Sequence, residues 1–212
     1  RSVDLLFGGY GQLNPYYGRF AANPQTDTVI AEARKIPFTF FTLWIGNNDV
    51  LGYALAGAEE NPSDPTAVIT PQPLFATAMD MIITSLTAFG QEGAIANIPD
   101  ITSIPFFTTV PYNALKLDAD NAALLNQGYA QYNAAIDQYQ LPVPKIEFTA
   151  GYNALIIADT SSPYNLLGGM RQIRSDELVL LSVPQDSIKC GGWGSQIPIP
   201  GHFTLTSDEI AE

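Results

Sequence analysis

The hydrophobic pattern of the first half of the chain predicts a strand, a helix and a second strand. Residues 38–45 form an apolar run without strict alternation, rich in aromatic and β-branched types, which is typical of a parallel strand buried on both faces. A helix over 24–35 precedes this run, and the long helix that follows covers 71–89. Its apolar residues lie three or four positions apart on one face: Phe75, Met79, Ile82, Leu86 and Phe89. A strand over 93–98 completes a right-handed βαβ unit.

The second half begins with another helical pattern, which is followed by a pattern of short strands and turns. Residues 118–139 predict one helix with Asp118 as its N-cap, and its tyrosines are interpreted as core residues. From position 141 the chain has short strand-like runs separated by Gly and Pro, and residues 146–157 around Gly151 predict a hairpin. The expected organisation is therefore an α/β core over 1–140, a β-rich insertion over 141–206 and the start of a further helix over 207–212, capped by Ser207.

Charge and cysteine content exclude several classes of function. Nine Lys and Arg against 21 Asp and Glu give a net charge of −12, which repels nucleic acid. A single cysteine, Cys190, cannot form an internal disulfide, and with a single histidine, His202, there is no ligand set for a structural zinc or iron site. No apolar window approaches the length of a membrane span, and both ends of the sequence look like interrupted helices, which suggests a fragment.

The most informative polar segment follows the predicted strand over 38–45. Ligands bind beyond the carboxyl ends of strands in open α/β sheets, and Gly46 allows a sharp turn and a close approach there. Asn48 offers a neutral amide donor suited to a developing oxyanion, and Asp49 can cap a helix that begins at Val50. Spacing alone favours the alternative that this segment is only a cap and a turn.

The segment Gly46-Asn47-Asn48-Asp49 resembles the G-x-N-D block, the third conserved block of the SGNH (GDSL-type) hydrolases, which are serine esterases and lipases. Residues 43–52, 98–105 and 14–17 are similar to a bacterial envelope-associated branch of that family. The resemblance implies a flavodoxin-like three-layer α/β/α core with a parallel sheet. It also implies a small-molecule or lipid ester as substrate, no cofactor or metal, and an envelope or extracellular location.

The resemblance also implies roles for individual residues. By position, Asn48 is the oxyanion-hole donor, although Asn47 lies beside it. Gly46 matches the glycine of the block and Asp49 its structural aspartate. The G-D-S-L block of the nucleophile is absent, and the glycine of the second block is expected upstream of Arg1.

The base of the family also has no counterpart, because Ile199 stands where a D-x-x-H pattern would place an aspartate before His202. Ser2, Ser161 and Ser162 have no nucleophile elbow around them and are expected to be surface hydroxyls. The expected enzyme therefore has its nucleophile and base outside this chain.

A non-catalytic module that binds a glycan or an acyl ligand is the alternative function. Trp193 is a candidate to line a substrate cleft, or else it packs its loop against the core.

Overall fold

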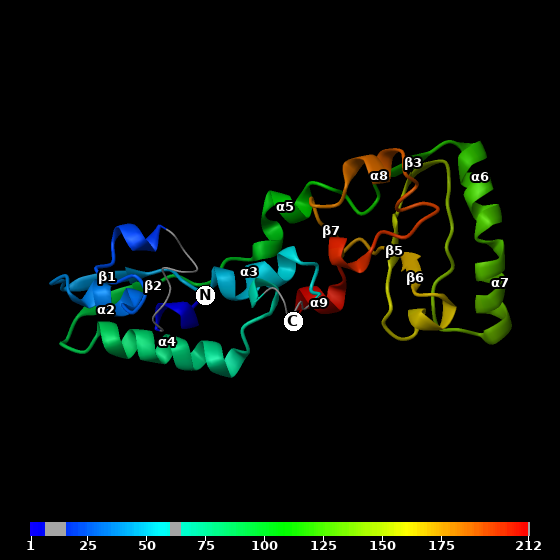
Figure 1. The fold of residues 1–212 in the computed structure, drawn as a ribbon. Helices are drawn as coiled ribbons and strands as arrows, with labels where there is room; N and C mark the ends of the chain where they lie inside the picture. The colour runs from blue at the N-terminus through cyan, green and yellow to red at the C-terminus, as the bar shows by residue number, and fades with distance from the viewer. Residues whose placement is uncertain (7–15, 60–64, 212) are drawn as a thin grey trace. The chain divides into compact units, whose positions relative to one another are not determined.

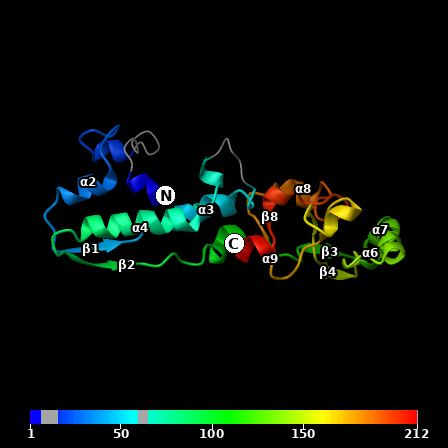
Figure 2. The same cartoon turned by 90° about the horizontal axis from the view of Figure 1, so that it is seen from below.

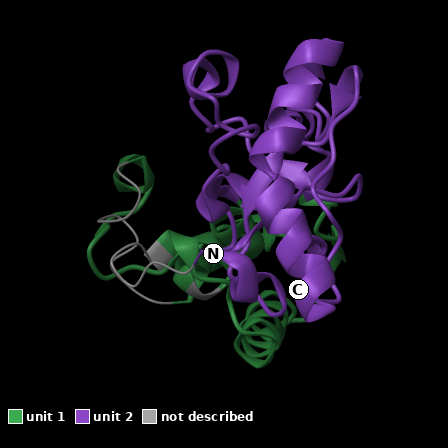
Figure 3. Ribbon diagram, turned by 90° about the vertical axis from the view of Figure 1, so that its right-hand side faces the viewer, with its two compact units in different colours: residues 1–54, 60–101 green, residues 55–59, 102–212 purple. Residues whose placement is uncertain are grey.

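The computed structural model describes residues 1–6, 16–59 and 65–211, and the chain is mixed α/β with 42% helix and 14% strand (Figure 1). It divides into two compact units, one of residues 1–54 with 60–101 and the other of residues 55–59 with 102–212 (Figure 3). Across the described part of the chain, no helix has the length and apolar character needed to cross a membrane.

The first unit is a parallel strand pair with helices. Strands β1 (Phe40–Leu43) and β2 (Glu92–Ile95) pair in parallel from Phe40 opposite Glu92 to Leu43 opposite Ile95. Helix α4 (Gln72–Leu86) lies along the pair (Figure 2), so the predicted strand, helix and parallel strand are confirmed. The other elements of this part of the chain are η1 (Val3–Leu5), η2 (Tyr17–Arg19), α2 (Val29–Arg34), α3 (Asn47–Leu55), η3 (Pro65–Ala67) and η4 (Ile101–Ser103).

The core of this unit forms on one face of β1. Ile30, Leu43, Ile82 and Leu86 are buried together, so α2, α4 and β1 share one apolar cluster. On the other face, Phe40 of the strand is 57% exposed, and Trp44, directly after the strand, is 70% exposed. The prediction of burial on both faces is therefore wrong for the structure as described, because helices cover only one face of this two-stranded sheet.

The second unit is built from three small antiparallel sheets and several helices. The sheets pair β3 (Leu115–Leu117) with β4 (Gly151–Asn153), β5 (Ile156–Ala158) with β6 (Met170–Gln172), and β7 (Leu178–Val179) with β8 (Thr204–Leu205). The helices are α5 (Pro105–Thr108), α6 (Ala119–Gly128), α7 (Ala130–Tyr139), η5 (Tyr164–Leu167), α8 (Gln185–Lys189), η6 (Gly201–Phe203) and α9 (Ser207–Ala211). The predicted boundary at residue 140 falls inside this unit, between α7 and β4.

The helix predicted over 118–139 is two helices that meet at Tyr129, directly after Gly128, a poor helix former. Asp118 is the N-cap of α6, as predicted, and its Oδ1 accepts the N–H of Asn121 at 2.8 Å. Tyr129 is buried as predicted, whereas Tyr139 is 66% exposed.

The predicted hairpin over 146–157 does not form. Residues 146–148 belong to no strand, and side-chain amides from Asn126, Asn133 and Gln172 provide their hydrogen bonds in place of a neighbouring strand. Each amide donates to one backbone carbonyl and accepts one backbone N–H, as a strand residue would. These six bonds are 2.8–3.2 Å long and join Asn126 to Phe148, Asn133 to Ile146 and Gln172 to Glu147.

The last helix, α9, begins at Ser207, the residue predicted to cap it. Thr206, and not Ser207, is its N-cap residue. The Thr206 backbone N–H and hydroxyl donate to the Glu209 carboxylate at 2.7 and 2.8 Å, which is the reciprocal half of a capping box. Ser207 instead donates its hydroxyl to Asp176 Oδ2 at 3.0 Å.

Candidate functional site

The turn that follows β1 requires glycine. Gly46 has φ +118°, in the region that residues with a side chain rarely adopt. A Cβ at this position would lie 2.6 Å from Ile98 Cδ1 and 3.3 Å from the ring of Phe75. The Asp49 N–H donates to the Gly46 carbonyl at 2.9 Å, so the chain turns directly into α3. Residues 46–48 therefore lie at the carboxyl end of a parallel strand, where the sequence predicted a site.

Hydrogen bonds of Asp49 fix this turn. The predicted role as a helix cap is wrong, because α3 begins at Asn47 and Asp49 lies inside its first turn. The carboxylate is 2% exposed and accepts the backbone N–H and the hydroxyl of Ser2, both at 2.8 Å. The Asp49 carbonyl also accepts the N–H of Thr70 at 3.1 Å. Asp49 thus ties three segments of the first unit together.

Ser2 was expected to be a surface hydroxyl, and the structure shows that it is not, because it binds the buried Asp49 carboxylate. Its side chain is fully buried, with 0% exposure, and its hydroxyl hydrogen bonds to the Asp49 carboxylate. A carboxylate that also binds the serine N–H holds this hydroxyl in place as a structural donor. The sequence offered no local signal, because the two residues are 47 positions apart.

The two asparagines of the turn differ in environment. The Asn48 side chain is exposed, and no hydrogen bond of its amide to the rest of the described chain is found. Asn47 is half-buried, and its Oδ1 is buried without a partner among the described residues. Both line a cavity of about 220 Å³, together with Arg1, Leu5, Trp44, Ile45 and Gly46. The Asn48 amide is thus available to a ligand, beside the first N–H groups of α3, which have no partner within the helix.

The second unit holds a buried ionic cluster that the sequence analysis missed. The Arg171 side chain is 1% exposed and donates to Asp159 Oδ2 at 2.6 Å and to both carboxylate oxygens of Glu177 at 2.6 and 2.7 Å. Ser161 donates its N–H and hydroxyl to Asp159, and Arg174 donates its N–H and Nε–H to Glu177. In the sequence, the local sign of this cluster is the spacing of Arg171, Arg174 and Glu177 at three-residue intervals.

The protonation of this cluster follows from its hydrogen bonds. Burial alone raises the pKa of Glu177, but hydrogen bonds from Arg171 and Arg174 outweigh it and hold that pKa below its ordinary value of 4.5. Burial likewise opposes ionisation of Asp159, and donation from Ser161 and Arg171 lowers its pKa below 3.8. The cluster is therefore fully ionised at neutral pH and its charges are internally compensated, which indicates a structural role.

A cavity of about 470 Å³ adjoins this cluster. Its lining includes the carboxylate residues Glu59, Asp208 and Glu209. Tyr164 also lines it, and the centroid of its ring is 4.9 Å from Arg171 Cζ. Across residues 1–6, 16–59 and 65–211, no group of three His, Cys, Asp or Glu side chains could hold a metal ion.

The remaining candidates lie in the second unit, in packed or exposed positions. Trp193 is half-buried against a core cluster, and its ring centroid is 5.8 Å from that of Phe203. His202 is half exposed in η6, and its Nδ1 lies 3.9 Å from Glu59 Oε2. Ser161 and Ser162 are exposed, as expected. A cleft-lining role for Trp193 stays a prediction.

Comparison of the chain with protein-family models found no match, and comparisons with curated proteins and with solved structures found no significant match either.

Proposed function

We propose that this chain is part of an SGNH-type serine hydrolase that cleaves carboxylic esters, with Asn48 as a donor of its oxyanion hole. The observation that carries the proposal is the turn after β1, where Gly46 bends the backbone, buried Asp49 fixes it and the Asn48 amide, beside a cavity, has no partner among the described residues. The resemblance of this segment to the G-x-N-D block assigns those three residues the same roles.

The proposal extends to the fold. Parallel sheets are nearly always covered on both faces, whereas β1 exposes Phe40 and Trp44 on one face. We infer that β1 and β2 belong to a larger parallel sheet of the flavodoxin-like α/β/α type. Elements beyond the described residues would then cover this face.

The mechanism assigns this chain the stabilisation of charge. A serine outside residues 1–212 attacks the ester carbonyl, and a histidine outside them transfers the proton from the serine to the leaving alcohol. The carbonyl oxygen becomes negative, and the Asn48 amide donates to it. The turn fixes the backbone at Asn48, and the neutral amide can donate to the oxygen as its charge develops. The N-terminal end of α3 adds a favourable dipole.

Two experiments test the proposal. The 212-residue chain should not react with a fluorophosphonate probe, since its nucleophile lies elsewhere, and stoichiometric labelling of a serine within it would contradict this. In a longer, active protein, Asn48→Ala should lower kcat by about 10²–10³ with little change in KM, because an oxyanion donor acts mainly in the transition state. Asn47→Ala is the matched control and should leave kcat within a few-fold.

If Asn48→Ala keeps its activity, the segment is only a structural turn. A binding module for a glycan or an acyl ligand is then the better explanation of the exposed Trp44 beside the cavity. A module of this kind would bind ligand without turnover.

A further inference from the structure

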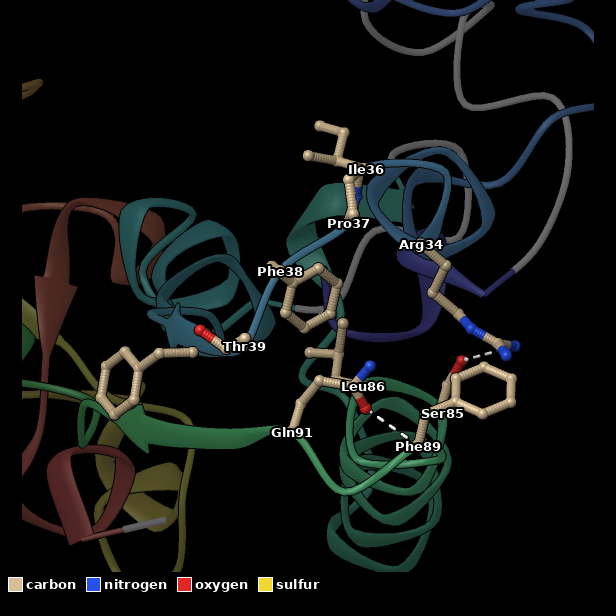
Figure 4. A pocket seen from close by; sticks show the side chains of 10 residues that line it. Arg34, Ile36, Pro37, Phe38, Thr39, Ser85, Leu86, Phe89 and Gln91 are labelled. Carbon is tan, nitrogen blue, oxygen red and sulfur yellow. Dashed lines mark hydrogen bonds between the residues drawn. The ribbon is translucent and has the colours of Figure 1, made fainter.

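A second cavity of the first unit lies at the amino end of β1, the opposite end of that strand from Gly46. Its volume of about 640 Å³ falls within the range of about 300–1,000 Å³ that is usual for small-molecule sites. The segment 36–40 that enters β1 lines one side, and the last turn of α4 with the loop after it lines the other (Figure 4). Its floor is apolar, because Leu86 is 6% exposed and Phe38 is half-buried.

The walls of this groove are apolar side chains that the first unit leaves open to solvent. Phe89 is 81% exposed and Ile36 is 65% exposed. Single exposed apolar residues are common on protein surfaces, but here both line the same cavity, which makes it a candidate interaction site.

The rim of the groove carries a cation. The Arg34 guanidinium lies over the ring of Phe89, with its Cζ 5.6 Å from the ring centroid, and its Nη1 donates to Ser85 Oγ at 3.5 Å. Among residues 1–6, 16–59 and 65–211, no carboxylate lies within ion-pair distance of Arg34, although the chain carries a net charge of −12. The neighbouring Lys35, in contrast, is paired with Glu32.

The donors of Arg34 and Ser85 suit an anion. Several N–H groups of the guanidinium have no acceptor within the described chain, and a guanidinium fork matches the two oxygens of a carboxylate. The Ser85 hydroxyl accepts from Arg34, which leaves its own hydrogen able to donate to the same anion. One cation beside an apolar hollow fits a ligand with one negative charge and a hydrocarbon body.

We propose that this groove binds a monocarboxylate with an apolar chain, of the medium-chain fatty acid type. The carboxylate accepts hydrogen bonds from Arg34 and Ser85, and the hydrocarbon covers Phe89 and lies over Phe38 and Leu86. A short carboxylate lacks the apolar contact, and a cationic amphiphile is repelled by the guanidinium. This inference concerns a site separate from the turn at Gly46, and its contacts with Arg34, Ser85 and Phe89 do not involve the face of β1 that exposes Phe40.

The test is calorimetric titration of the protein with sodium decanoate. We expect saturable binding with one site, no detectable binding of acetate and at least tenfold weaker binding of decyltrimethylammonium. Arg34→Gln should weaken decanoate binding by about tenfold or more, because it removes a charge-assisted donor pair. Arg19→Gln is the matched control, since Arg19 also lies over an exposed ring, that of Tyr16 at 5.2 Å, away from the groove. It should leave the affinity unchanged.

A second variant separates the apolar contribution to binding from that of the Arg34 charge. Phe89→Ser removes an apolar wall without threatening the fold, because that side chain is 81% exposed. It should weaken decanoate binding several-fold and leave the preference for the anion intact. Absence of saturable decanoate binding, equal affinity in Arg34→Gln and the parent protein, or equal binding of the cationic amphiphile would each overturn the proposal.

Discussion

The hydrogen bonds of the Asp49 carboxylate make a quantitative prediction about the first unit. In Asp49→Ala, the backbone N–H and the hydroxyl of Ser2 lose their acceptor while Ser2 stays fully buried. Hydrogen bonds to a charged group contribute about 1.5–3 kcal/mol each, and a buried donor without a partner adds its own desolvation penalty. Because the two bonds share one carboxylate, they do not add fully, and we expect a loss of about 3–5 kcal/mol in the free energy of unfolding.

Two partial variants test the reasoning behind that magnitude. Asp49→Asn keeps an acceptor for the Ser2 N–H, and its amide can donate to the Ser2 hydroxyl once that hydroxyl rotates. It should therefore cost about half as much as alanine. Ser2→Ala removes only one of the two bonds and should cost about 1–2 kcal/mol. Asp80→Ala, at an exposed position of α4, is the control and should stay within about 0.5 kcal/mol of the parent protein.

The assay is urea denaturation, with hydrogen exchange of the peptides that cover β1 and α3 to localise the effect. Asp49→Ala should lower the denaturation midpoint and the protection of these peptides together. An Asp49→Ala protein within about 1 kcal/mol of the parent would refute the argument, as would an Asp49→Asn protein that is no more stable than the alanine variant. Either result would mean that water replaces the carboxylate at Ser2 at little cost.

Three further outcomes are expected. Gly46→Ala should destabilise the protein by at least about 2 kcal/mol in a urea titration, because the new Cβ would lie 2.6 Å from Ile98 Cδ1 at a φ of +118°. Glu177→Gln should lower the thermal midpoint at pH 7, since it leaves the Arg171 guanidinium without one charge partner. The folded protein lowers the pKa of Glu177 below its ordinary value of 4.5. The stability that Glu177 contributes is therefore present above pH 4.5 and is lost as the pH falls through the lower pKa of the folded protein. The melting curves of parent and variant should then converge in acid. Asn133→Asp should cost about 2–4 kcal/mol, measured by urea denaturation, because a carboxylate cannot donate to a backbone carbonyl and repels it.

The elements that could be predicted from the sequence are those with a local cause. Helix α4 and strand β1 follow from patterns within short windows, and the parallel pairing of β1 with β2 follows from the order strand, helix, strand along the chain. The Asp118 cap is likewise local, because a side chain and a backbone N–H three residues on are enough to form it.

The features that could not be predicted depend on partners far along the chain. Residues 146–148 have the composition of a strand, but their hydrogen bonds go to amides as far as 25 positions away, and no hairpin signal reports this. At the candidate site, the sequence located the turn and Gly46 correctly. It did not predict the buried bond from Ser2 to Asp49, since nothing near either residue marks the other as its partner.

The amides that hold residues 146–148 also make the second unit sensitive to chemical ageing. A backbone ladder survives unless the chain is cut, whereas a primary amide hydrolyses slowly in water and asparagine is a thermolabile residue. Deamidation of Asn126 or Asn133 would turn a donor that binds a carbonyl into a carboxylate that repels it. Old or heat-treated protein should then release this segment from α6 and α7 with its peptide bonds intact, and each event should add about one mass unit and one negative charge.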